Sequence, residues 1–245
     1  MSRFYFYLLL LFFIGCSSSR HTILEPRNGK SFVLVFQPSH QTDTGRNFNE
    51  AVTCNSIIEA AMAGSPKDMQ FHKVWSHDVE GIHHAREGSN TKIDHTTAID
   101  SLGRISGYAW ELTESNKLHP DVFIAVHNNG GTNRHACWGF VHEGDQYEAR
   151  NRELAASLVK EICSRTSLEN RGVLGDSSPN RNDYRCRATG KLSFYSLDEN
   201  VNSAPYRVLL EIGDNQASRD FLTNADSLTT LGKSIRRVVD EWFSQ

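Results

Sequence analysis

Three short apolar runs constrain the fold of this chain most strongly, because each ends abruptly in polar, proline or glycine residues. They cover residues 32–36, 122–126 and 206–210 of the 245-residue chain. Each run is rich in β-branched, aliphatic or aromatic side chains, a composition typical of a strand that is buried on both faces. Such strands need a covering layer on each side, so the runs predict a sheet at the centre of an α/β domain.

The segments between these runs have helical spacing or short strand character. We predict helices over residues 47–63, 94–116, 147–166 and 218–243, further strands over 69–75 and 138–142, and an edge strand over 192–197. Residues 167–187 are polar and irregular, so we expect a long loop there. Strands and helices that alternate in this way predict a single α/β domain over residues 31–245. Its sheet should be mostly parallel or mixed, with about six strands and helices on both faces.

Composition agrees with a soluble globular body. Hydrophobic residues make up 38% of the chain and charged residues 22%, and the formal net charge is -3. A weakly acidic balance gives no general attraction for nucleic acid, so we expect no nucleic-acid partner.

The N-terminus has the pattern of an export signal. Arg3 precedes a wholly apolar run over residues 4–14, which ends at Gly15 and Cys16. This run is shorter than the roughly 20 apolar residues that span a membrane, and it is typical of a secretory signal. Its end resembles a bacterial lipobox, so we expect a lipoprotein signal peptide over residues 1–16, lipidation of Cys16 and a tether over 17–30. The alternative is an ordinary cleaved signal with an incidental cysteine. The lipid-anchored form would be exported and held on a bacterial membrane, facing the periplasm.

Four cysteines remain in the body of the chain: Cys54, Cys137, Cys163 and Cys186. Export would place them in an oxidising compartment, where disulfides persist. A bridge between Cys137 and Cys186 is one candidate, whereas Cys163 lies on an apolar helix face and is expected as a buried free thiol. The complete pattern stays open, since four cysteines allow three full pairings.

Residues with metal-binding and acid-base chemistry follow all three apolar runs. His40 follows the first, with Glu50 ten residues later in the first turn of the next predicted helix; His127 follows the second run, and Glu211 follows the third. The carboxyl ends of parallel strands meet at one edge of a sheet, where α/β proteins place their sites. Two histidines and one glutamate are a known catalytic zinc set, which leaves Glu211 as a general base for hydrolysis of an amide or ester. The alternative is a stabilising charge at a helix start and structural histidines at strand ends.

Other polar residues near these runs carry weaker signals. His77, His83 and His84 form a cluster without clean ligand spacing, so we expect solvated loop positions rather than metal ligands. Asn129 follows His127 closely, and Arg187 lies in the polar segment 167–187. We name both as candidate substrate-binding residues, with a purely solvated arginine as the alternative.

The order of four motifs resembles one enzyme family. The motifs are His40-Gln41 after a strand, Asn49-Glu50-Ala51 at a helix start, Ala125-Val126-His127-Asn128-Asn129-Gly130, and Leu209-Leu210-Glu211-Ile212-Gly213. Together they are similar to those of the zinc-dependent N-acetylmuramoyl-L-alanine amidases, amidase type 3, over roughly residues 32–243. Three positions depart from the family pattern: Ser39 and Gln41 replace glycines that flank the first histidine, and Asp214 replaces an apolar residue.

The resemblance implies both a site and a reaction. His40, Glu50 and His127 would bind one zinc ion, and Glu211 would be the catalytic carboxylate. The family hydrolyses the amide bond between the lactyl group of N-acetylmuramic acid and L-alanine in peptidoglycan or muropeptides. The implied fold is a mixed α/β domain around a mostly parallel sheet of about six strands, as the apolar runs also predict.

Two alternatives remain beside this reading. Another zinc peptidase or deacylase on the same scaffold would use the same ligands, and a non-catalytic peptidoglycan-binding lipoprotein would need none of the chemistry. The ten-residue step from His40 to Glu50 disfavours carboxypeptidases of similar shape, and the presence of Glu211 disfavours a silent binding protein. Glycan cleavage by paired carboxylates would leave the two strand-end histidines without a role.

Overall fold

A computed structural model of the chain describes residues 31–42, 48–64, 69–79, 107–177 and 194–243. The predicted signal peptide, Cys16 and the tether lie outside these ranges, as do His83, His84, Cys186 and Arg187. The elements in chain order are β1 Phe32–Pro38, α1 Glu50–Met62, β2 Met69–Lys73, η1 Ser76–Asp78, α2 Gly107–Lys117, β3 Val122–Asn129, β4 Ala136–Val141, α3 Glu148–Arg165, β5 Glu169–Gly175, η2 Tyr195–Leu197, β6 Tyr206–Asp214, α4 Arg219–Leu222 and α5 Ala225–Phe243.

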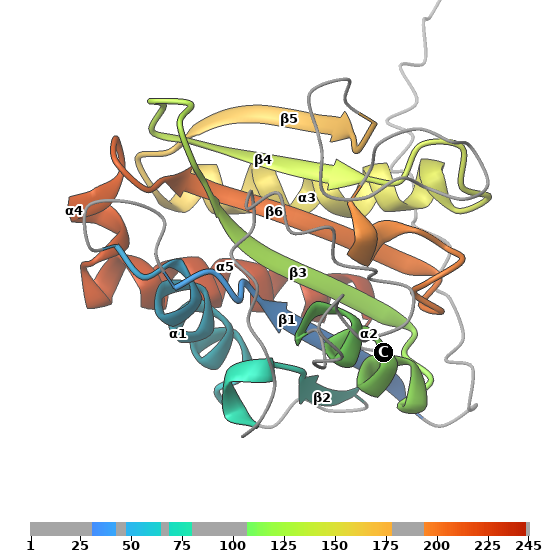
Figure 1. Cartoon of the computed structure of the whole chain (residues 1–245). Coiled ribbons are helices and arrows are strands. Elements are labelled where there is room, and N and C mark those ends of the chain that lie inside the picture. The colour runs from blue at the N-terminus through green and yellow to red at the C-terminus, as the bar shows by residue number, and fades with distance from the viewer. Residues whose placement is uncertain (1–30, 43–47, 65–68, 80–106, 178–193, 244–245) are drawn as a thin grey trace, which may run out of the picture.

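The strands form one six-stranded mixed sheet in the order β2-β1-β3-β6-β4-β5 (Figure 1). Strands β2, β1, β3 and β6 run parallel to one another. Strand β4 runs antiparallel to β6, and β5 is parallel to β4. The predicted α/β domain with a mixed sheet of six strands is therefore confirmed. The carboxyl ends of β1, β3 and β6 all point toward the same edge, on the left of Figure 1.

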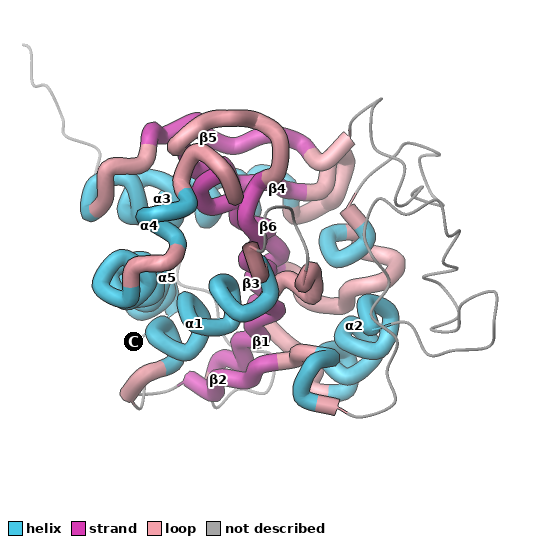
Figure 2. The backbone as a smooth tube through the Cα atoms, turned by 60° about the vertical axis from the view of Figure 1, so that its left-hand side comes forward, coloured by secondary structure: helices cyan, strands magenta, loops and turns pink. Residues whose placement is uncertain are grey.

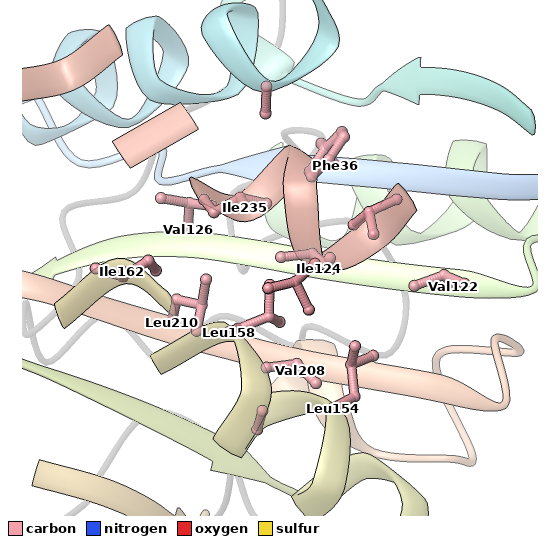
Figure 3. Packing of buried hydrophobic residues seen from close by; sticks show 14 of the residues in the cluster. Phe36, Val122, Ile124, Val126, Leu154, Leu158, Ile162, Val208, Leu210 and Ile235 are labelled. Atoms are coloured by element: carbon pink, nitrogen blue, oxygen red, sulfur yellow. The ribbon is translucent and has the colours of Figure 1, made fainter. Parts of the chain in front are cut away.

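Helices cover the two faces of the sheet unequally. Helices α1, α3 and α5 pack on one face, where their apolar side chains form the larger core with alternate residues of β1, β3 and β6 (Figures 2 and 3). Helix α2 and the η2 segment cover the other face with a smaller core. The apolar runs are continuous because both sets of alternating side chains are buried, as predicted for strands between two layers.

Close contact between α1 and α5 depends on one glycine. A Cβ atom on Gly232 of α5 would lie 2.4 Å from the carbonyl oxygen of Ile57 and 2.5 Å from Cβ of Ala60, both on α1. Only a residue without a side chain allows this approach. The contact matters for function because it fixes the helix that begins at Glu50.

Three secondary-structure predictions are wrong. The described part of segment 192–197 is the short 3-10 helix η2 rather than an edge strand, and the true edge strand β5 lies within the segment expected to be a loop. The predicted helix over 218–243 is divided into α4 and α5. Asn224 sits at the break, and its side-chain oxygen accepts a hydrogen bond from the Ser227 amide at 3.0 Å, as an N-cap residue does.

The edge of the sheet opposite the strand ends holds a buried ion pair. Arg207, at the start of β6, is only 2% exposed and pairs with Asp145 in the β4–α3 connection. Its guanidinium also donates to the carbonyl oxygens of Leu197, Asn202 and Ala204, so the buried charge is well compensated.

The thiols of Cys54, Cys137 and Cys163 are free, and Cys163 is half-buried. Within the described ranges, no helix has the length and apolar character needed to cross the membrane.

Candidate functional site

The register of β3 and β6 brings two of the predicted residues together. His127 and Glu211 are Cα partners on these neighbouring parallel strands, so their side chains leave the same face of the sheet at its carboxyl edge. Glu211 is also the partner of Trp138 on antiparallel β4. His127 is 4% exposed, and Glu211 is more accessible. A buried imidazole therefore lies beside a glutamate that is partly exposed.

Glu50 enters the same place from the start of α1. Asn49 caps this helix, because its side-chain oxygen accepts a hydrogen bond from the Val52 amide at 3.1 Å. The carboxylate of Glu50 lies at the positive end of the helix and is almost completely buried, at 1% exposure. Its Oε1 accepts a hydrogen bond from the Asn128 amide at 3.2 Å and lies 3.4 Å from Nδ1 of His127.

The separation of these two atoms fits a shared zinc ion. Zinc–nitrogen and zinc–oxygen bonds of about 2.0–2.1 Å at a tetrahedral angle place two donor atoms about 3.3 Å apart. Glu50 Oε1 and His127 Nδ1 are 3.4 Å apart. Across the described ranges, however, no three His, Cys, Asp or Glu side chains are gathered closely enough to hold a metal ion. The structure thus shows a pair of donors with suitable chemistry and spacing.

His40, the third predicted ligand, lies in the loop between β1 and α1. Ser39 donates its amide to the Val126 carbonyl at 2.9 Å, so the loop leaves β1 directly beside the end of β3. His40 is buried, at 5% exposure. The structure therefore places His40 next to the strand end that carries His127, although not in a three-donor cluster with it.

Asn128 connects the three elements that carry the site. Its side-chain nitrogen donates to the carbonyl oxygen of Ile212 on β6 at 2.7 Å, and its side-chain oxygen accepts from the Cys54 thiol of α1 at 3.5 Å. Burial, followed by the charge of Glu50, raises the pKa of the Cys54 thiol well above its usual value. Cys54 therefore remains a protonated hydrogen-bond donor.

Glu111 of α2 is a second buried carboxyl near the site. It accepts hydrogen bonds from the Gln37 side chain at 2.6 Å and from the amide and hydroxyl of Ser76 at 2.8 and 2.7 Å. Complete burial raises the pKa of this carboxyl from 4.5 to about 7, even though these hydrogen bonds and the charge of His127 act in the opposite direction. Glu111 holds the strand end of β1 and the segment after β2 against α2.

Asp214 organises the chain beyond Glu211, which accounts for the polar residue at this position. Its carboxylate accepts hydrogen bonds from the amide and hydroxyl of Thr132 and from the amides of Asn133, Gln216 and Ala217. Burial alone would raise the pKa of Asp214, but these hydrogen bonds outweigh it and lower the pKa. Asn129, the candidate substrate contact, is the Cα partner of Asp214 at the end of β3.

A pocket of about 450 Å³ lies beyond the end of β6. It is lined by His135, Ser167 and residues 216–221. The ring of His135 is held by the hydroxyls of Ser218 and Ser167 at 2.8 and 2.9 Å, so this histidine has a structural role in the pocket wall.

The structure thus joins His127 to Glu50 by a close contact and to Glu211 by strand register, with His40 in the adjoining loop and Asn129 at the same edge. The sequence analysis assigned no role to Asn128 or Glu111. Asn128 is adjacent to His127, which is the only sequence signal that could have drawn attention to it; Glu111 sits in an ordinary helical pattern and gave none.

Comparisons with known proteins agree with this arrangement. The family model described as N-acetylmuramoyl-L-alanine amidase matches residues 88–241, which include His127 and Glu211 and amount to more than half of the chain. A comparison with curated protein sequences gives no match.

Solved structures of amidases share the fold. An N-acetylmuramoyl-L-alanine amidase from Clostridium difficile 630 superposes with a TM-score of 0.58 at 15% identity, covering 87% of this chain and 97% of that one. AmiC2 of Nostoc punctiforme gives a TM-score of 0.55 at 14% identity, covering 86% and 96%. The catalytic domain of CwlV from Bacillus (Paenibacillus) polymyxa var. colistinus gives 0.56 at 15% identity, covering 86% and 97%. Matches of this extent must include residues before position 88, so the shared fold reaches beyond the segment that the family model covers.

Proposed function

The chain belongs to the N-acetylmuramoyl-L-alanine amidase family, and from this premise we propose that it is a zinc-dependent hydrolase of the muramoyl–L-alanine amide in peptidoglycan or muropeptides. His40, Glu50 and His127 are the proposed ligands of one zinc ion, and Glu211 is the proposed catalytic carboxylate. The observation that carries the proposal is the contact of Glu50 Oε1 with His127 Nδ1 at 3.4 Å, directly beside Glu211 on the neighbouring strand.

The donor set decides which chemistry the site supports. Zinc held by two imidazoles and a carboxylate would act as a Lewis acid on water and on the amide carbonyl. Glu50 lies at a helix N-terminus and accepts a hydrogen bond from the Asn128 amide, which orients the carboxylate. Burial of all three ligands in a rigid frame limits their motion, which supports a defined coordination geometry.

Glu211 is suited to proton transfer because it is partly exposed at the carboxyl edge of the sheet, while its strand is paired on both sides. It would accept a proton from the attacking water and deliver it to the departing nitrogen of L-alanine, a role worth about 10²–10⁴-fold in rate. Hydrolysis needs both transfers, since an amine leaves readily only when it is protonated. Asn129 and Arg187 are proposed contacts to the substrate.

The proposed substrate agrees with the proposed location of the protein. The apolar run after Arg3 and the Gly15-Cys16 pair support export and lipid anchoring at Cys16 on a bacterial membrane, facing the periplasm. Replacement of Cys16 by serine tests this proposal by metabolic labelling with a fatty acid. Label in the parent and none in the Cys16→Ser variant is the expected result; equal labelling would refute the anchor.

Two substitutions separate metal binding from proton transfer. Glu211→Gln should keep parental zinc content and lose amidase turnover, because the variant retains the shape of the side chain but cannot accept a proton. His127→Ala should lose zinc and turnover together. Zinc content by elemental analysis and turnover on purified muropeptides are measured on the same preparations.

Each outcome has a defined meaning. Parental turnover in Glu211→Gln would refute the assigned proton transfer, and parental zinc content in His127→Ala would remove that residue from the ligand set. A zinc-loaded parent that releases no L-alanine peptide would refute the proposed substrate while leaving the metal site in place.

A further inference from the structure

The loop that carries His40 is held by three consecutive carbonyl oxygens. The Ser39 carbonyl accepts a hydrogen bond from the indole nitrogen of Trp75 at 3.1 Å. The His40 carbonyl lies 2.8 Å from Nε2 of His77, and the Gln41 carbonyl accepts the Ala51 amide at 2.8 Å. Two of these three contacts come from side chains of one short segment, residues 75–77, which follows β2.

The contact between His77 and His40 has a defined direction. A carbonyl oxygen can only accept, so Nε2 of His77 carries the hydrogen and donates it to the His40 carbonyl. His77 is thus fixed in one tautomer by the backbone of the residue it holds. The centroids of the Trp75 and His77 rings lie 5.0 Å apart, so the two rings pack against each other.

The 75–77 segment is itself anchored to the frame of the site. Ser76, between the two donors, is completely buried and donates both its amide and its hydroxyl to Glu111 of α2. The other oxygen of Glu111 accepts from Gln37, which lies three residues before His40 on β1. The two donors therefore belong to a hydrogen-bonded network that links α2 to the end of β1 and to the loop that follows it.

We propose that His77 is a positioning residue for His40, acting through the hydrogen bond from its Nε2 to the His40 carbonyl. The inference rests on the proposed role of His40 as a zinc ligand. Fixing the carbonyl fixes the peptide plane of His40 and hence the direction in which its Cα–Cβ bond leaves the loop. Groups that orient metal ligands typically change metal affinity by about 10–100-fold when they are removed.

The test compares two substitutions of His77 with two controls. His77→Ala removes the donor, whereas His77→Gln keeps a side-chain nitrogen near the position of Nε2. His72→Ala removes an imidazole from the same part of the chain, but its Cα partner on β1 is Val35, five residues before His40. Asn151→Ala removes the buried hydrogen bond from the Arg207 amide, at the sheet edge opposite the strand ends, and controls for loss of stability.

Two quantities are measured on each full-length protein. Zinc affinity is determined with the zinc ion alone, by competition with a chelator of known affinity. Exchange of the Ser39 and Ala51 amides, which donate to Val126 and Gln41, is followed by NMR in the metal-free proteins. We expect His77→Ala to bind zinc about tenfold more weakly or worse and to exchange both amides faster. His77→Gln should recover most of both losses, and the two controls should bind zinc as the parent does.

Parental zinc affinity in His77→Ala, or equal weakening in Asn151→Ala, would overturn the positioning role while leaving the zinc proposal intact. Equal losses in the Ala and Gln variants would also overturn it, because the donor would then be irrelevant. A parent that binds no zinc would refute the ligand assignment of His40, and the exchange rates would decide the inference alone. Unchanged exchange in His77→Ala would then overturn it, and faster exchange that glutamine reverses would support it.

Discussion

Glu111 makes this fold less stable as the pH rises, which is the opposite of the effect of an ion-paired carboxylate. The carboxyl is completely buried, and its pKa is raised from 4.5 to about 7. A group whose pKa is higher in the folded protein binds its proton more tightly there than in the unfolded chain. Its contribution is therefore fully present below about pH 4.5 and is lost as the pH rises through 7.

The structure gives the size of the effect. One pKa unit corresponds to about 1.4 kcal/mol, so ionising Glu111 costs about 3 kcal/mol in the free energy of unfolding once the pH is well above 7. Glu111→Gln is a neutral variant of the same shape and removes this cost. In the described structure the side-chain oxygen of Gln37 has no hydrogen-bond partner, so a flipped Gln37 amide can accept from either the protonated acid or the new amide.

The assay is urea-induced unfolding of the parent and of Glu111→Gln over a series of pH values. From about pH 5 to about pH 8 the variant should gain about 2–3 kcal/mol relative to the parent, with most of the gain below pH 7 and a plateau above it. Glu114→Gln, one turn nearer the exposed end of the same helix, is the matched control and should follow the parent. A constant difference between Glu111→Gln and the parent across this range would refute the reasoning, because the titration would then lie elsewhere.

Two further predictions concern packing and hydrogen bonding around the site. Asn128→Ala removes the bonds to Ile212 and Cys54 and leaves their buried groups without these partners, so it should lower the free energy of unfolding by about 1–3 kcal/mol. Chemical unfolding measures this loss, and parental stability would show that Asn128 does not connect the elements. Gly232→Ala would force a methyl group to within 2.4 Å of the Ile57 carbonyl, so we expect a loss of about 1–3 kcal/mol and a lower thermal midpoint. An unchanged midpoint would show that α1 and α5 separate at little cost.

The centre of the sheet could be predicted from the sequence because burial on both faces leaves a clear signal. The apolar runs 32–36, 122–126 and 206–210 have no alternation, and the structure buries every residue in them. The edge strand β5 was not predicted because all of its residues are at least partly exposed. Glu169–Gly175 therefore carries no apolar pattern and is defined by its backbone pairing to β4. In contrast, the apolar segment at Phe194 gave a false strand signal, because its buried ring packs on Phe140 from a 3-10 turn.

In the candidate site, likewise, some residues could be predicted from the sequence and others could not. His127 and Glu211 were predicted to meet because parallel strands deliver their ends to one edge, and the register pairs them directly. The supporting contacts could not be predicted, because they join residues that are distant in sequence. Glu111 and Gln37 are 74 residues apart, and His77 and His40 are 37 apart. Neither pair has a local pattern, so only the folded chain shows them.

The most direct test of the central claim is the chemical identity of the product released from purified peptidoglycan by the zinc-loaded protein. Mass spectrometry should detect stem peptides with a free N-terminal L-alanine and glycan strands with intact lactyl carboxylates, in the parent but not in Glu211→Gln. Release of shortened peptides or of glycan fragments, or equal release by the variant, would contradict an amidase that uses Glu211 at the joined ends of β3 and β6.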